Sequence, residues 1–571
     1  MKYVLVSGGV ISGLYVSSIK IDPYLNVDAG TMSPMEHGEV FVLDDGGEVD
    51  LDLGNYERYL NITLTRENNI TTGKIYKHVI DEERKGSYLG KTVQVVPHIT
   101  DAIQEWIERV AKIPVDDTNE EPDVCIIELG GTIGDIESMP FVEAMTQLRR
   151  RAGRNNFMNI HVSYIPVING EQKTKPTQQT IKAVRSAGLI PDLIACRCER
   201  PLDKGTVEKI ARFCQVEDEQ VVAVRDMPSI YQVPILLEEQ GFIPLLRSSL
   251  RLDNCTFSQL LVKKGHDIWN QWKTLTLAGH HGYLETVTIA LVGKYIDLHD
   301  SYLSVIKSLE HCAMKCKRKL KIVWVDSEHL ESKSSSKDTA KYHKAWHDMC
   351  TADGVLVPGG FGNRGIEGMV VAAKWARENG RPYLGICLGM QVAVIDYARS
   401  VCGITNATSE EFAGTTGASN VIVYMPEINK EVMGGTMRLG LRPTLFQPDS
   451  EWSKLRKLYK DKNGEILERH RHRYEVNPEY VEQLESAGLT FIGKDDQGVR
   501  MEIIELKDHP WFVGVQFHPE YLSRVLDPSR PYLGFLAASA NCLDEITKQQ
   551  AESLNGPNGN GANGHMDTSA F

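Results

Sequence analysis

Two short motifs, far apart in the sequence, constrain the fold of this chain most strongly. The first is an apolar run at 382–386 followed by Cys387, which has one glycine two residues before it and another two residues after it. This spacing is typical of a nucleophile elbow, a tight turn from a strand into a helix. The second motif spans 515–520 and carries His518 and Glu520, whose side chains share one face of an extended segment. A sheet that brings the two motifs together would place a thiol nucleophile, a base and an orienting carboxylate in one site.

A glycine-rich turn at 358–362, which follows an apolar run, is a third motif. Its backbone N–H groups can point toward a developing oxyanion. Each motif alone has an ordinary interpretation, since a buried cysteine is usually a small apolar residue and a His-Pro-Glu segment is usually a turn. Together the motifs resemble those of the class I glutamine amidotransferases, which release ammonia from glutamine through a glutamyl thioester. The resemblance implies that Cys387, His518 and Glu520 are the catalytic residues of a glutaminase.

The composition is that of a globular enzyme. The 571 residues are 42% hydrophobic and 24% charged, and they suffice for two or three domains with full cores. A net charge of −13 argues against a general affinity for nucleic acid or for anionic membranes. The eleven cysteines lack the spacing of a zinc site, and no apolar run has the length of a membrane span or a signal peptide. We therefore expect a cytoplasmic protein with reduced thiols.

Apolar runs alternate with helix-like stretches along both halves of the chain. This pattern predicts the α/β class, with two domains that are each built on a mostly parallel sheet with flanking helices. The sequence becomes polar before a new apolar run opens at Thr286, so we predict a first domain at 1–269, a linker at 270–286 and a second domain at 287–547. Residues 548–571, rich in Asn and Gly, are expected to form a disordered tail.

Polar segments at predicted strand ends indicate a ligand site in the first domain. Asp52 and Glu128 are a carboxylate pair of the kind that binds Mg²⁺ on nucleotide phosphates. Exposed acids that cap helices or solvate turns would look the same, so both interpretations stay open. We expect segment 50–54 to be extended, with two carboxylates on one face. Segment 173–178 combines two lysines with hydrogen-bonding side chains, as either a phosphate clamp or a charged surface loop would.

The sequence resembles the CTP synthase family from residue 1 to about residue 547. Five strings carry the resemblance: SIKIDPY at 18–24, HGEVFV at 37–42, DLDLG at 50–54, GGTIGDIE at 130–137 and KTKPTQ at 173–178. The resemblance implies a P-loop-like amidoligase (synthetase) domain followed by a glutamine amidotransferase domain. In the implied reaction, ATP phosphorylates O4 of UTP, glutamine hydrolysis supplies ammonia, and ammonia displaces the phosphate to give CTP. This is the last step of de novo pyrimidine nucleotide synthesis.

The same resemblance assigns residues to roles. It implies Asp52 and Glu128 as Mg²⁺ ligands, and it places His37 near the mouth of an ammonia tunnel. The implied nucleotide-binding residues are Ser12, Lys20, Asp135, Ile136, Glu137, Lys173, Thr174, Lys175, Pro176, Thr177, Gln178, Lys209, Arg225, Asp226 and Met227. The implied glutamine-binding residues are Gly360, Gln391, Glu411 and Arg473. A guanidinium suits the α-carboxylate of glutamine. Segment 434–440 matches a mobile lid near the family's GTP activator site.

The resemblance also implies cofactors and partners. These are Mg²⁺, ATP as co-substrate, GTP as allosteric activator, and CTP as a feedback inhibitor that overlaps the UTP site. It implies a homotetramer arranged as a dimer of dimers, with filaments as a further assembly. At 145–151 the sequence departs from the family, which usually has an arginine before Gln147 and an apolar or aromatic residue where Arg150 stands. That stretch lies near the family's subunit interface, although a solvated helix face is an equally good interpretation.

A larger departure lies near the N-terminus. Family members continue the first glycine turn into Gly-Lys-Gly and a helix, whereas residues 7–13 here run directly into 14–20. The eight positions between Val6 and Tyr15 are too few for a helical crossover, so we predict that the flanking strands do not keep the usual parallel arrangement. Losing a phosphate-binding lysine and a helix N-terminus removes charge stabilisation, which typically costs about two to three orders of magnitude in rate. We therefore expect this chain to synthesise CTP poorly.

Two other functions compete with an ordinary CTP synthase. A synthetase-defective isoform, acting as a glutaminase or as a regulatory or structural subunit of a CTP synthase assembly, would fit the shortened glycine loop. Another glutamine-dependent amidoligase with an ATP-binding N-terminal half is the third alternative. The strings at 130–137 and 173–178 argue against it.

Overall fold

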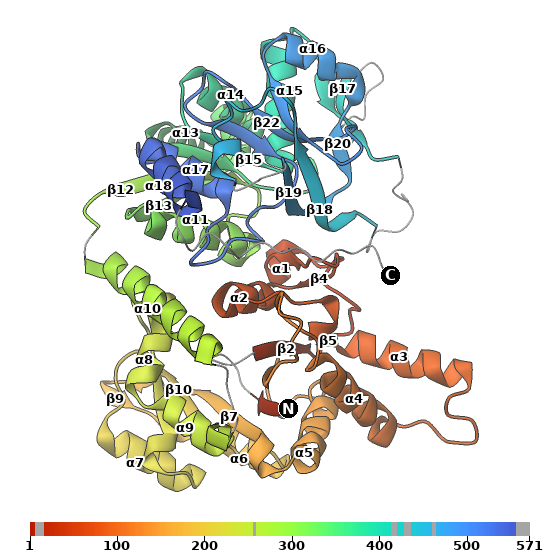
Figure 1. Ribbon diagram of the computed structural model, residues 1–571, viewed down its shortest axis with the longest axis vertical. Helices are drawn as coiled ribbons and strands as arrows, with labels where there is room; N and C mark the ends of the chain where they lie inside the picture. Colours follow the sequence, from red (N-terminus) through yellow and green to blue (C-terminus); the bar gives the residue numbers. More distant parts are fainter. Residues whose placement is uncertain are drawn as a thin grey trace. The chain divides into compact units, whose positions relative to one another are not determined.

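The computed structural model describes most of the chain and divides it into two compact units (Figure 1). The described residues are 1–5, 16–254, 259–281, 283–412, 419–426, 436–459 and 464–555. Unit 1 comprises residues 1–29 and 55–281, and unit 2 comprises residues 30–54 together with the described chain after Gly282. A short segment from the N-terminal part of the sequence therefore packs with the second unit.

Unit 1 is built on a seven-stranded parallel sheet with the order β11-β10-β7-β1-β6-β2-β5. The strands are β1 (Lys2–Leu5), β2 (Val16–Asp22), β5 (Asn69–Thr71), β6 (Val124–Leu129), β7 (Phe157–Tyr164), β10 (Leu193–Cys198) and β11 (Val221–Arg225). The helices are α3 (Thr72–Lys85), α4 (Thr100–Val110), α5 (Met139–Ala152), α6 (Lys175–Ser186), α7 (Lys204–Cys214), α8 (Val233–Glu239), α9 (Phe242–Ser249) and α10 (Gln259–His281).

The sheet of unit 1 is buried on both faces, which explains why its strands read as continuous apolar runs. Along β6, Cys125 and Ile127 pack in a cluster with residues of α4 and α5. The alternating residues Val124 and Ile126 pack in a second cluster with residues of α9. This is the layered arrangement expected of an α/β domain, and the predicted fold class is confirmed.

The prediction that the first two strands lose their parallel arrangement is wrong. β1 and β2 both pair in parallel with β6, which lies between them. Leu5 is opposite Ile127, and Val16 is opposite Val124. The end of β1 and the start of β2 are therefore three residues, about 10 Å, apart along the strand direction, and two strand spacings of about 5 Å each apart across the sheet. The ten residues between β1 and β2, 6–15, can reach about 33 Å. The prediction fails because β6 lies between β1 and β2, and because the end of β1 and the start of β2 are close enough for a short connection without a helix. Residues 6–15 themselves lie outside the described residues.

The segment expected to be extended at 50–54 instead begins a helix. A short antiparallel hairpin, β3 (Val40–Val42) with β4 (Glu48–Asp50), follows the short helix α1 (Pro34–His37). Helix α2 (Leu51–Leu60) starts directly after β4, and the carboxylate of Asp50 accepts a hydrogen bond from the Asp52 backbone N–H at 3.0 Å. An aspartate that binds a first-turn N–H group favours a helix start. The two carboxylates therefore do not share one face of a strand.

Unit 2 is built on a nine-stranded mixed sheet with the order β13-β12-β14-β15-β23-β22-β21-β18-β19. The strands are β12 (Thr286–Gly293), β13 (Lys319–Asp326), β14 (Gly354–Val357), β15 (Tyr383–Ile386), β18 (Arg438–Phe446), β19 (Glu465–His472), β21 (Thr490–Lys494), β22 (Met501–Glu505) and β23 (Phe512–Val515). The pairs from β13 to β23 are parallel, as expected, whereas those from β23 to β19 are antiparallel. A smaller sheet contains β16 (Ala407–Ser409), β17 (Ser419–Tyr424) and β20 (Tyr474–Val476).

Helices cover both faces of the parallel part of this sheet. The helices of unit 2 include α11 (Leu303–Lys315), α13 (Thr339–Thr351), α14 (Ile366–Glu378), α15 (Leu388–Ser400), α16 (Val481–Ser486), α17 (Arg530–Ser539) and α18 (Leu543–Asn555). α14 and α15 pack in one core cluster with Tyr383 of β15, whereas α11 and α17 pack in the other with Leu384 and Ile386. Helices therefore pack against both faces of β15, the strand that precedes the predicted nucleophile.

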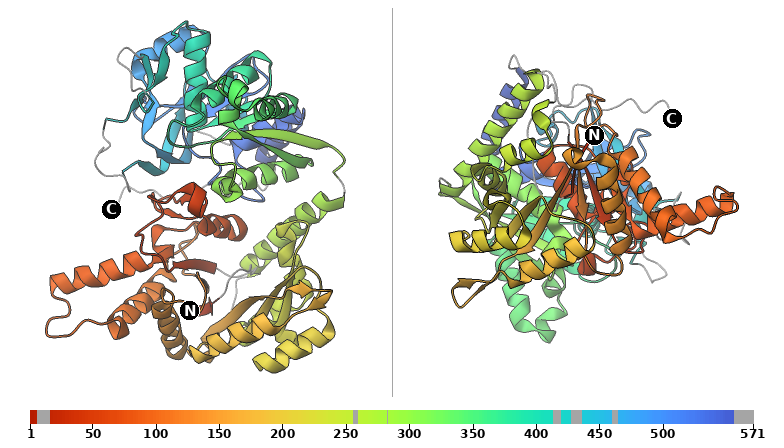
Figure 2. Two further views of the ribbon diagram at one scale, coloured as in Figure 1. Left: turned by 180° about the vertical axis from the view of Figure 1, so that it is seen from behind. Right: turned by 90° about the horizontal axis from the view of Figure 1, so that it is seen from below.

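The expected linker and the expected tail are both partly helical. α10, the long yellow-green helix in Figure 2, continues to His281, so most of the expected linker at 270–286 is helical. Trp272 on this helix is buried and its indole N–H donates to the Tyr231 carbonyl at 2.9 Å, which anchors the helix to unit 1. α18 continues to Asn555, so the first residues of the expected disordered tail are helical. The remainder, from residue 556, lies outside the described residues.

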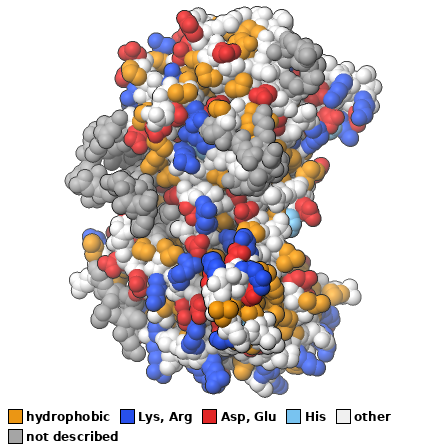
Figure 3. Space-filling model, turned by 90° about the vertical axis from the view of Figure 1, so that its right-hand side faces the viewer, with side chains coloured by type: hydrophobic (Ala, Val, Ile, Leu, Met, Phe, Trp, Pro, Cys, Tyr) orange, Lys and Arg blue, Asp and Glu red, His pale blue; other side chains and the backbone are white. Residues whose placement is uncertain are grey.

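The surface agrees with the acidic, mixed composition. On the face drawn in Figure 3, basic and acidic side chains are interspersed. Among the helices in the described part of the chain, none combines the length and apolar content needed to cross a membrane.

Candidate active site

Cys387 occupies a strained turn between β15 and α15. Its φ of 51° and ψ of −102° lie where non-glycine residues are rare, as expected for a nucleophile elbow. A Cβ atom on Gly385 would lie 2.6 Å from the Gly389 backbone, and one on Gly389 would lie 2.0 Å from the Val357 carbonyl oxygen. Both glycines are therefore required because the backbone of the turn is tightly packed.

The structure brings His518 and Glu520 to Cys387. The Nδ1 atom of His518 lies 2.8 Å from Oε1 of Glu520. A Cβ atom built on Gly359 would lie 2.8 Å from Cε1 of His518 and 3.6 Å from Cβ of Cys387, so the glycine turn, the imidazole and the thiol converge. All three predicted catalytic side chains are buried.

The surroundings control the charge of the imidazole. Burial disfavours a charge on His518, but the Glu520 carboxylate and the Cys387 side chain outweigh it and raise the pKa of His518 to about 10. The imidazole therefore holds a proton at neutral pH. Glu520 is itself fixed, because the Tyr532 hydroxyl donates to its Oε2 at 3.4 Å and the Ser308 hydroxyl donates to its backbone carbonyl at 3.3 Å.

The glycine turn and the start of α15 lie next to each other. A Cβ atom on Gly360 would lie 3.7 Å from Cδ2 of Leu388, so the two residues are neighbours. Leu388 is the first residue of α15, and its N–H group has no partner within the helix. Two backbone N–H groups beside a nucleophile are the arrangement of an oxyanion hole.

Gln391 links the expected glutamine pocket to the thiol. Its side-chain NH₂ donates to the Tyr474 carbonyl at 3.1 Å and to Oε1 of Gln516 at 3.2 Å. The NH₂ of Gln516 in turn lies 3.5 Å from Sγ of Cys387. Gln516 was not predicted as a site residue, although it stands inside the His-Pro-Glu motif. Its role depends on packing between β23 and β15, which the motif alone does not reveal.

Two cationic side chains, Lys294 and Arg473, act on the carboxylate of Glu411. It accepts a hydrogen bond from the Gly362 backbone N–H at 3.0 Å. Burial raises the pKa of Glu411, opposed by that hydrogen bond and by the charges of Lys294 and Arg473. A carboxylate and a guanidinium in one region would match the α-ammonium and α-carboxylate groups of an amino acid. Of the four expected glutamine-binding residues, Gly360 belongs to the glycine turn and Glu411 contacts that turn. Arg473 acts on Glu411 through its charge, and Gln391 contacts Gln516 beside the thiol.

Lys294 is a further site residue that sequence reasoning missed. Its Nζ atom donates to the carbonyls of Phe361 and Gly362, the first at 3.2 Å, and burial lowers its pKa to about 8. The lysine thereby fixes the glycine turn. A lysine directly after a buried strand was the available signal, because strand ends carry ligand-binding groups in open sheets.

In unit 1, charged residues gather at the carboxyl ends of neighbouring strands. Lys20 and Glu128 are opposite each other on β2 and β6, with Nζ and Oε1 3.2 Å apart. The Tyr56 hydroxyl also donates to Glu128. Asp52 lies in the first turn of α2, in the part of the chain that packs with unit 2, so its pairing with Glu128 remains a prediction. His37, the last residue of α1, belongs to the same part of the chain.

The other expected nucleotide-binding residues occupy three places. Asp135, Ile136 and Glu137 lie in a turn between β6 and α5, and Ile136 is 88% exposed. Segment 173–178 runs into α6, where Thr177 is buried and accepts a hydrogen bond from the Ser163 hydroxyl at 2.9 Å. Lys173 binds Glu171 and lowers the pKa of that exposed carboxyl, and the charge of Lys209 contributes to the same effect. Arg225 is the last residue of β11 and is followed by Asp226 and Met227, whereas Ser12 lies outside the described residues.

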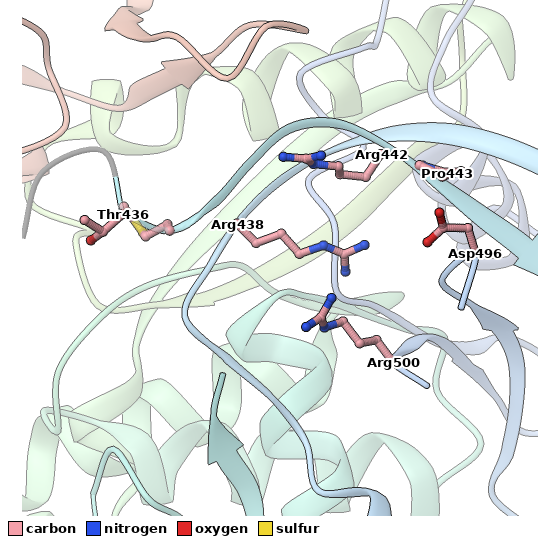
Figure 4. A pocket seen from close by; sticks show the side chains of 7 residues that line it. Thr436, Arg438, Arg442, Pro443, Asp496 and Arg500 are labelled. Carbon is pink, nitrogen blue, oxygen red and sulfur yellow. The ribbon is translucent and has the colours of Figure 1, made fainter. Parts of the chain in front are cut away.

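A cavity of about 340 Å³ lies beside the expected lid (Figure 4). Its lining includes Thr436, Arg438, Arg442 and Arg500, with Asp496 facing the guanidinium groups. Residues 436–440 of the lid are described, and the two glycines before them lie outside the described residues. Arg438 and Arg500 also pair with the carboxylates of Glu502 and Glu475, whereas Nε of Arg442 donates to the Leu439 carbonyl.

Three buried residues near this cavity have the composition of a metal site. The possible ligand atoms of His470, His472 and Glu502 lie within 4.8 Å of one another. However, Arg438 forms an ion pair with Glu502, and Nδ1 of His470 lies 3.1 Å from Nε2 of His472, within hydrogen-bond distance. Burial and then the charge of Arg438 lower the pKa of His470. These cationic surroundings disfavour a divalent ion.

Comparison with known proteins agrees with both halves of this description. Residues 9–252 match the family model "CTP synthase N-terminus", and residues 297–538 match "Glutamine amidotransferase class-I". A CTP synthase of Neurospora crassa is 64% identical over 582 residues, covering 98% of this chain and 100% of the relative. A CTP synthase of Schizosaccharomyces pombe is 63% identical over 570 residues, covering 97% of this chain and 94% of the relative. A solved Trypanosoma brucei glutaminase domain with bound acivicin is 42% identical, covers 45% of this chain and 94% of that chain, and has a TM-score of 0.41.

The fold and the site of unit 2 define a class I glutamine amidotransferase domain, with its cysteine on an elbow that faces a histidine–glutamate pair. The relatives extend the match across both units. The chain belongs to the CTP synthase family.

Proposed function

We propose that this chain is a glutamine-hydrolysing CTP synthase, which aminates UTP to CTP with ATP and with ammonia from glutamine. The observation that carries the proposal is the convergence of Cys387, His518 and Glu520 at the glycine turn, which the Glu411 carboxylate also contacts. The Lys20–Glu128 pair at the strand ends of unit 1 supports a phosphoryl-transfer site in the other unit.

In the glutaminase reaction, the sulfur of Cys387, whose proton His518 takes up, attacks the carboxamide carbon of glutamine. The N–H groups near Gly360 and Leu388 stabilise the oxyanion, and His518 gives its proton to the departing ammonia. A water molecule then hydrolyses the glutamyl thioester, with His518 accepting a proton from the water. Glu411 binds the α-ammonium group and Arg473 the α-carboxylate, while Glu520 holds the imidazole in place.

In the synthetase reaction, ATP phosphorylates O4 of UTP and ammonia displaces the phosphate. Carboxylate oxygens suit Mg²⁺, so Asp52 and Glu128 would hold it. The ion, when bound, neutralises the charge of the transferring phosphoryl group. Lys20 contacts the same group, and ammonia would enter near His37. Residues 135–137, 173–178 and Lys209 bind the pyrimidine nucleotide, and residues 225–227 lie near the adenine. Ser12 belongs to the shortened glycine loop.

The finer properties of the family are proposed for this chain as well. The arginine-lined cavity beside the lid supports GTP as an allosteric activator, because guanidinium groups bind phosphates. CTP is proposed as a feedback inhibitor at the UTP site, and a homotetramer, with filaments, as the assembly. A cytoplasmic location fits the free thiols, since the cysteines in the described part of the chain form no disulfide.

The experiment that tests the proposal measures CTP formed from UTP and ATP with either glutamine or ammonia as nitrogen donor. We expect Cys387→Ala to abolish the glutamine-dependent reaction and to leave the ammonia-dependent reaction in place. Loss of both reactions in the variant, with a folded protein, would contradict the assignment of Cys387 to ammonia release.

A second function is favoured by the connection between β1 and β2. Its ten residues lack the Gly-Lys-Gly sequence of the family, although the strands keep their parallel pairing with β6. The chain would then be a glutaminase or a regulatory subunit that assembles with an intact synthase. Glutamine hydrolysis without ammonia-dependent CTP formation would support this function, and near-normal CTP formation would exclude it.

A further inference from the structure

The hairpin of β3 and β4, residues 40–50, comes from the N-terminal part of the sequence but packs within unit 2. There it contacts three residues, Tyr521, Arg469 and Arg471, each of which touches a member of the catalytic triad. The contacts of these three residues are independent of one another and are described in turn.

Tyr521 connects the hairpin to the imidazole. Its hydroxyl donates to the carbonyl of Val40 at 3.0 Å. Its ring stacks on the ring of His518, with centroids 5.2 Å apart and an interplanar angle of 17°. Phe41 of the hairpin packs edge-on against the same tyrosine, with centroids 5.0 Å apart. The hairpin thus holds the aromatic ring on which the imidazole lies.

Arg469 connects the hairpin to the backbone of His518. Its buried guanidinium pairs with Asp44, with Nε and Oδ1 2.5 Å apart, and also donates to the Val42 carbonyl at 3.1 Å. The carbonyl of Arg469 accepts a hydrogen bond from the His518 backbone N–H at 2.8 Å. A shift of this arginine would therefore also move the backbone carbonyl to which the His518 N–H is hydrogen-bonded.

Arg471 connects the hairpin to the thiol and to the glycine turn. Its Nε atom lies 2.9 Å from Oε1 of Glu48, whose side chain is 1% exposed. Its guanidinium lies 5.2 Å from the centroid of the Phe361 ring, next to Gly360. Its carbonyl oxygen lies 3.9 Å from Sγ of Cys387.

The two arginines act in the same way because they are two residues apart on β19. Their side chains therefore point to one face of the strand, toward Asp44 and Glu48. A buried guanidinium keeps its place only while a carboxylate compensates its charge. Removing that carboxylate would displace the strand on which the triad depends.

We propose that Asp44 and Glu48 are positioning residues for the glutaminase triad, acting through Arg469 and Arg471. Neither carboxylate touches substrate in this proposal, which rests on the glutaminase reaction proposed above. The glutaminase unit would thus need a hairpin supplied by the N-terminal part of the chain for its full activity.

The test compares Glu48→Gln with Glu48→Asp in the full chain. We expect Glu48→Gln to lower kcat for glutamine hydrolysis by about tenfold or more, because displacements near 1 Å at a reacting centre have effects of this size. The KM for glutamine should change by less than about twofold, since no group of the pocket is removed. Glu48→Asp keeps the charge and should restore most of kcat. Alkylation of Cys387 by iodoacetamide should also be slower in Glu48→Gln.

Asp396→Asn is the matched control. Asp396 is also 1% exposed and lies 2.9 Å from an arginine, Arg377, in the same unit, but this pair joins α14 to α15 away from the hairpin. If Glu48→Gln and Asp396→Asn lower kcat, alkylation rate and thermal unfolding temperature alike, Glu48 is only structural and the proposal is wrong. If the wild-type chain hydrolyses no glutamine, the proposed reaction fails, while the alkylation rates still decide between positioning and structure.

Discussion

At the scale of single residues, the surrounding structure sets the backbone conformation of Cys387 and the pKa of His518. Cys387 has an ordinary side chain on a backbone that only a tightly packed turn maintains. His518 is buried, yet Glu520 and Cys387 keep its pKa far above the ordinary value of 6.5. The residue types of the triad followed from the sequence. The proton on His518 did not, because it results from the balance of burial against a nearby carboxylate.

The raised pKa of His518 predicts a pH dependence of stability. Because the folded pKa of about 10 exceeds the ordinary 6.5, the folded protein binds this proton more tightly than the unfolded chain does. The resulting stabilisation is fully present below pH 6.5 and is lost as the pH rises through about 10. Glu520→Gln should remove most of it, since the Glu520 charge is the largest of the influences that raise the pKa of the buried imidazole. The urea midpoints of wild type and variant should therefore converge between pH 7 and 10. A constant difference across this range would contradict the prediction.

Glu411 offers a prediction about substrate binding. Glu411→Gln removes the carboxylate proposed for the α-ammonium group, and a charged hydrogen bond of this kind is worth about 1.5–3 kcal/mol. We expect the KM for glutamine to rise by about tenfold or more, with a smaller change in kcat. Steady-state glutaminase assays measure both constants. Ammonia-dependent CTP formation serves as the control and should be unchanged, whereas a parallel loss there would indicate general damage.

At the scale of elements, the packing of glycines decides which turns can form. Gly389 is the second residue of α15, and a Cβ atom there would lie 2.0 Å from the Val357 carbonyl oxygen. Gly205 is the second residue of α7, with no atom within 4 Å of its built Cβ. Both glycines occupy the same position in their helices, so the two sites differ in packing alone.

Alanine substitutions at these two glycines should have opposite effects. Gly389→Ala should lower the free energy of unfolding by about 1–3 kcal/mol, since overpacking forces the elbow and β14 apart. Gly205→Ala should be neutral or should stabilise by up to about 1 kcal/mol, because alanine is the better helix former. Chemical denaturation of the two variants measures both effects. Equal destabilisation would mean that helix position, and not the contact with Val357, sets the cost.

The elements that sequence patterns missed were those decided by neighbouring segments. The start of α2 at Leu51 depends on a capping contact from Asp50, in a stretch that also reads as a strand. The parallel arrangement of β1 and β2 depends on β6, which pairs with both strands and lies more than a hundred residues later in the sequence. Counting residues between consecutive strands cannot reveal such an insertion, because adjacency in a sheet is set by long-range pairing.

At the scale of the whole molecule, the division into units does not follow the order of the chain. Residues 30–54 precede most of unit 1 in sequence but pack with unit 2. A fragment that starts at Gly282 would therefore leave Arg469 and Arg471 without Asp44 and Glu48. We expect it to fold, because the core clusters of unit 2 are formed by residues after 286.

The fragment should nevertheless hydrolyse glutamine several-fold more slowly than the full chain, since uncompensated buried charges displace β19. Steady-state kinetics and circular dichroism of the two proteins test this expectation. Adding a peptide that spans residues 34–50 should restore part of kcat. A fragment as active as the full chain would show that the hairpin is dispensable for the glutaminase.

The sequence by itself determined the class of the fold, the family and the residues that carry the chemistry. These depend on local signals, such as a cysteine between glycines after a buried strand, which neighbouring residues fix within a few positions. Only the tertiary structure decided which charges those residues hold and which distant segments support them. The proton on His518 results from burial and a nearby carboxylate, and the ion pairs of Asp44 and Glu48 with the two arginines of β19 join distant parts of the chain. Neither can be predicted from a local sequence pattern.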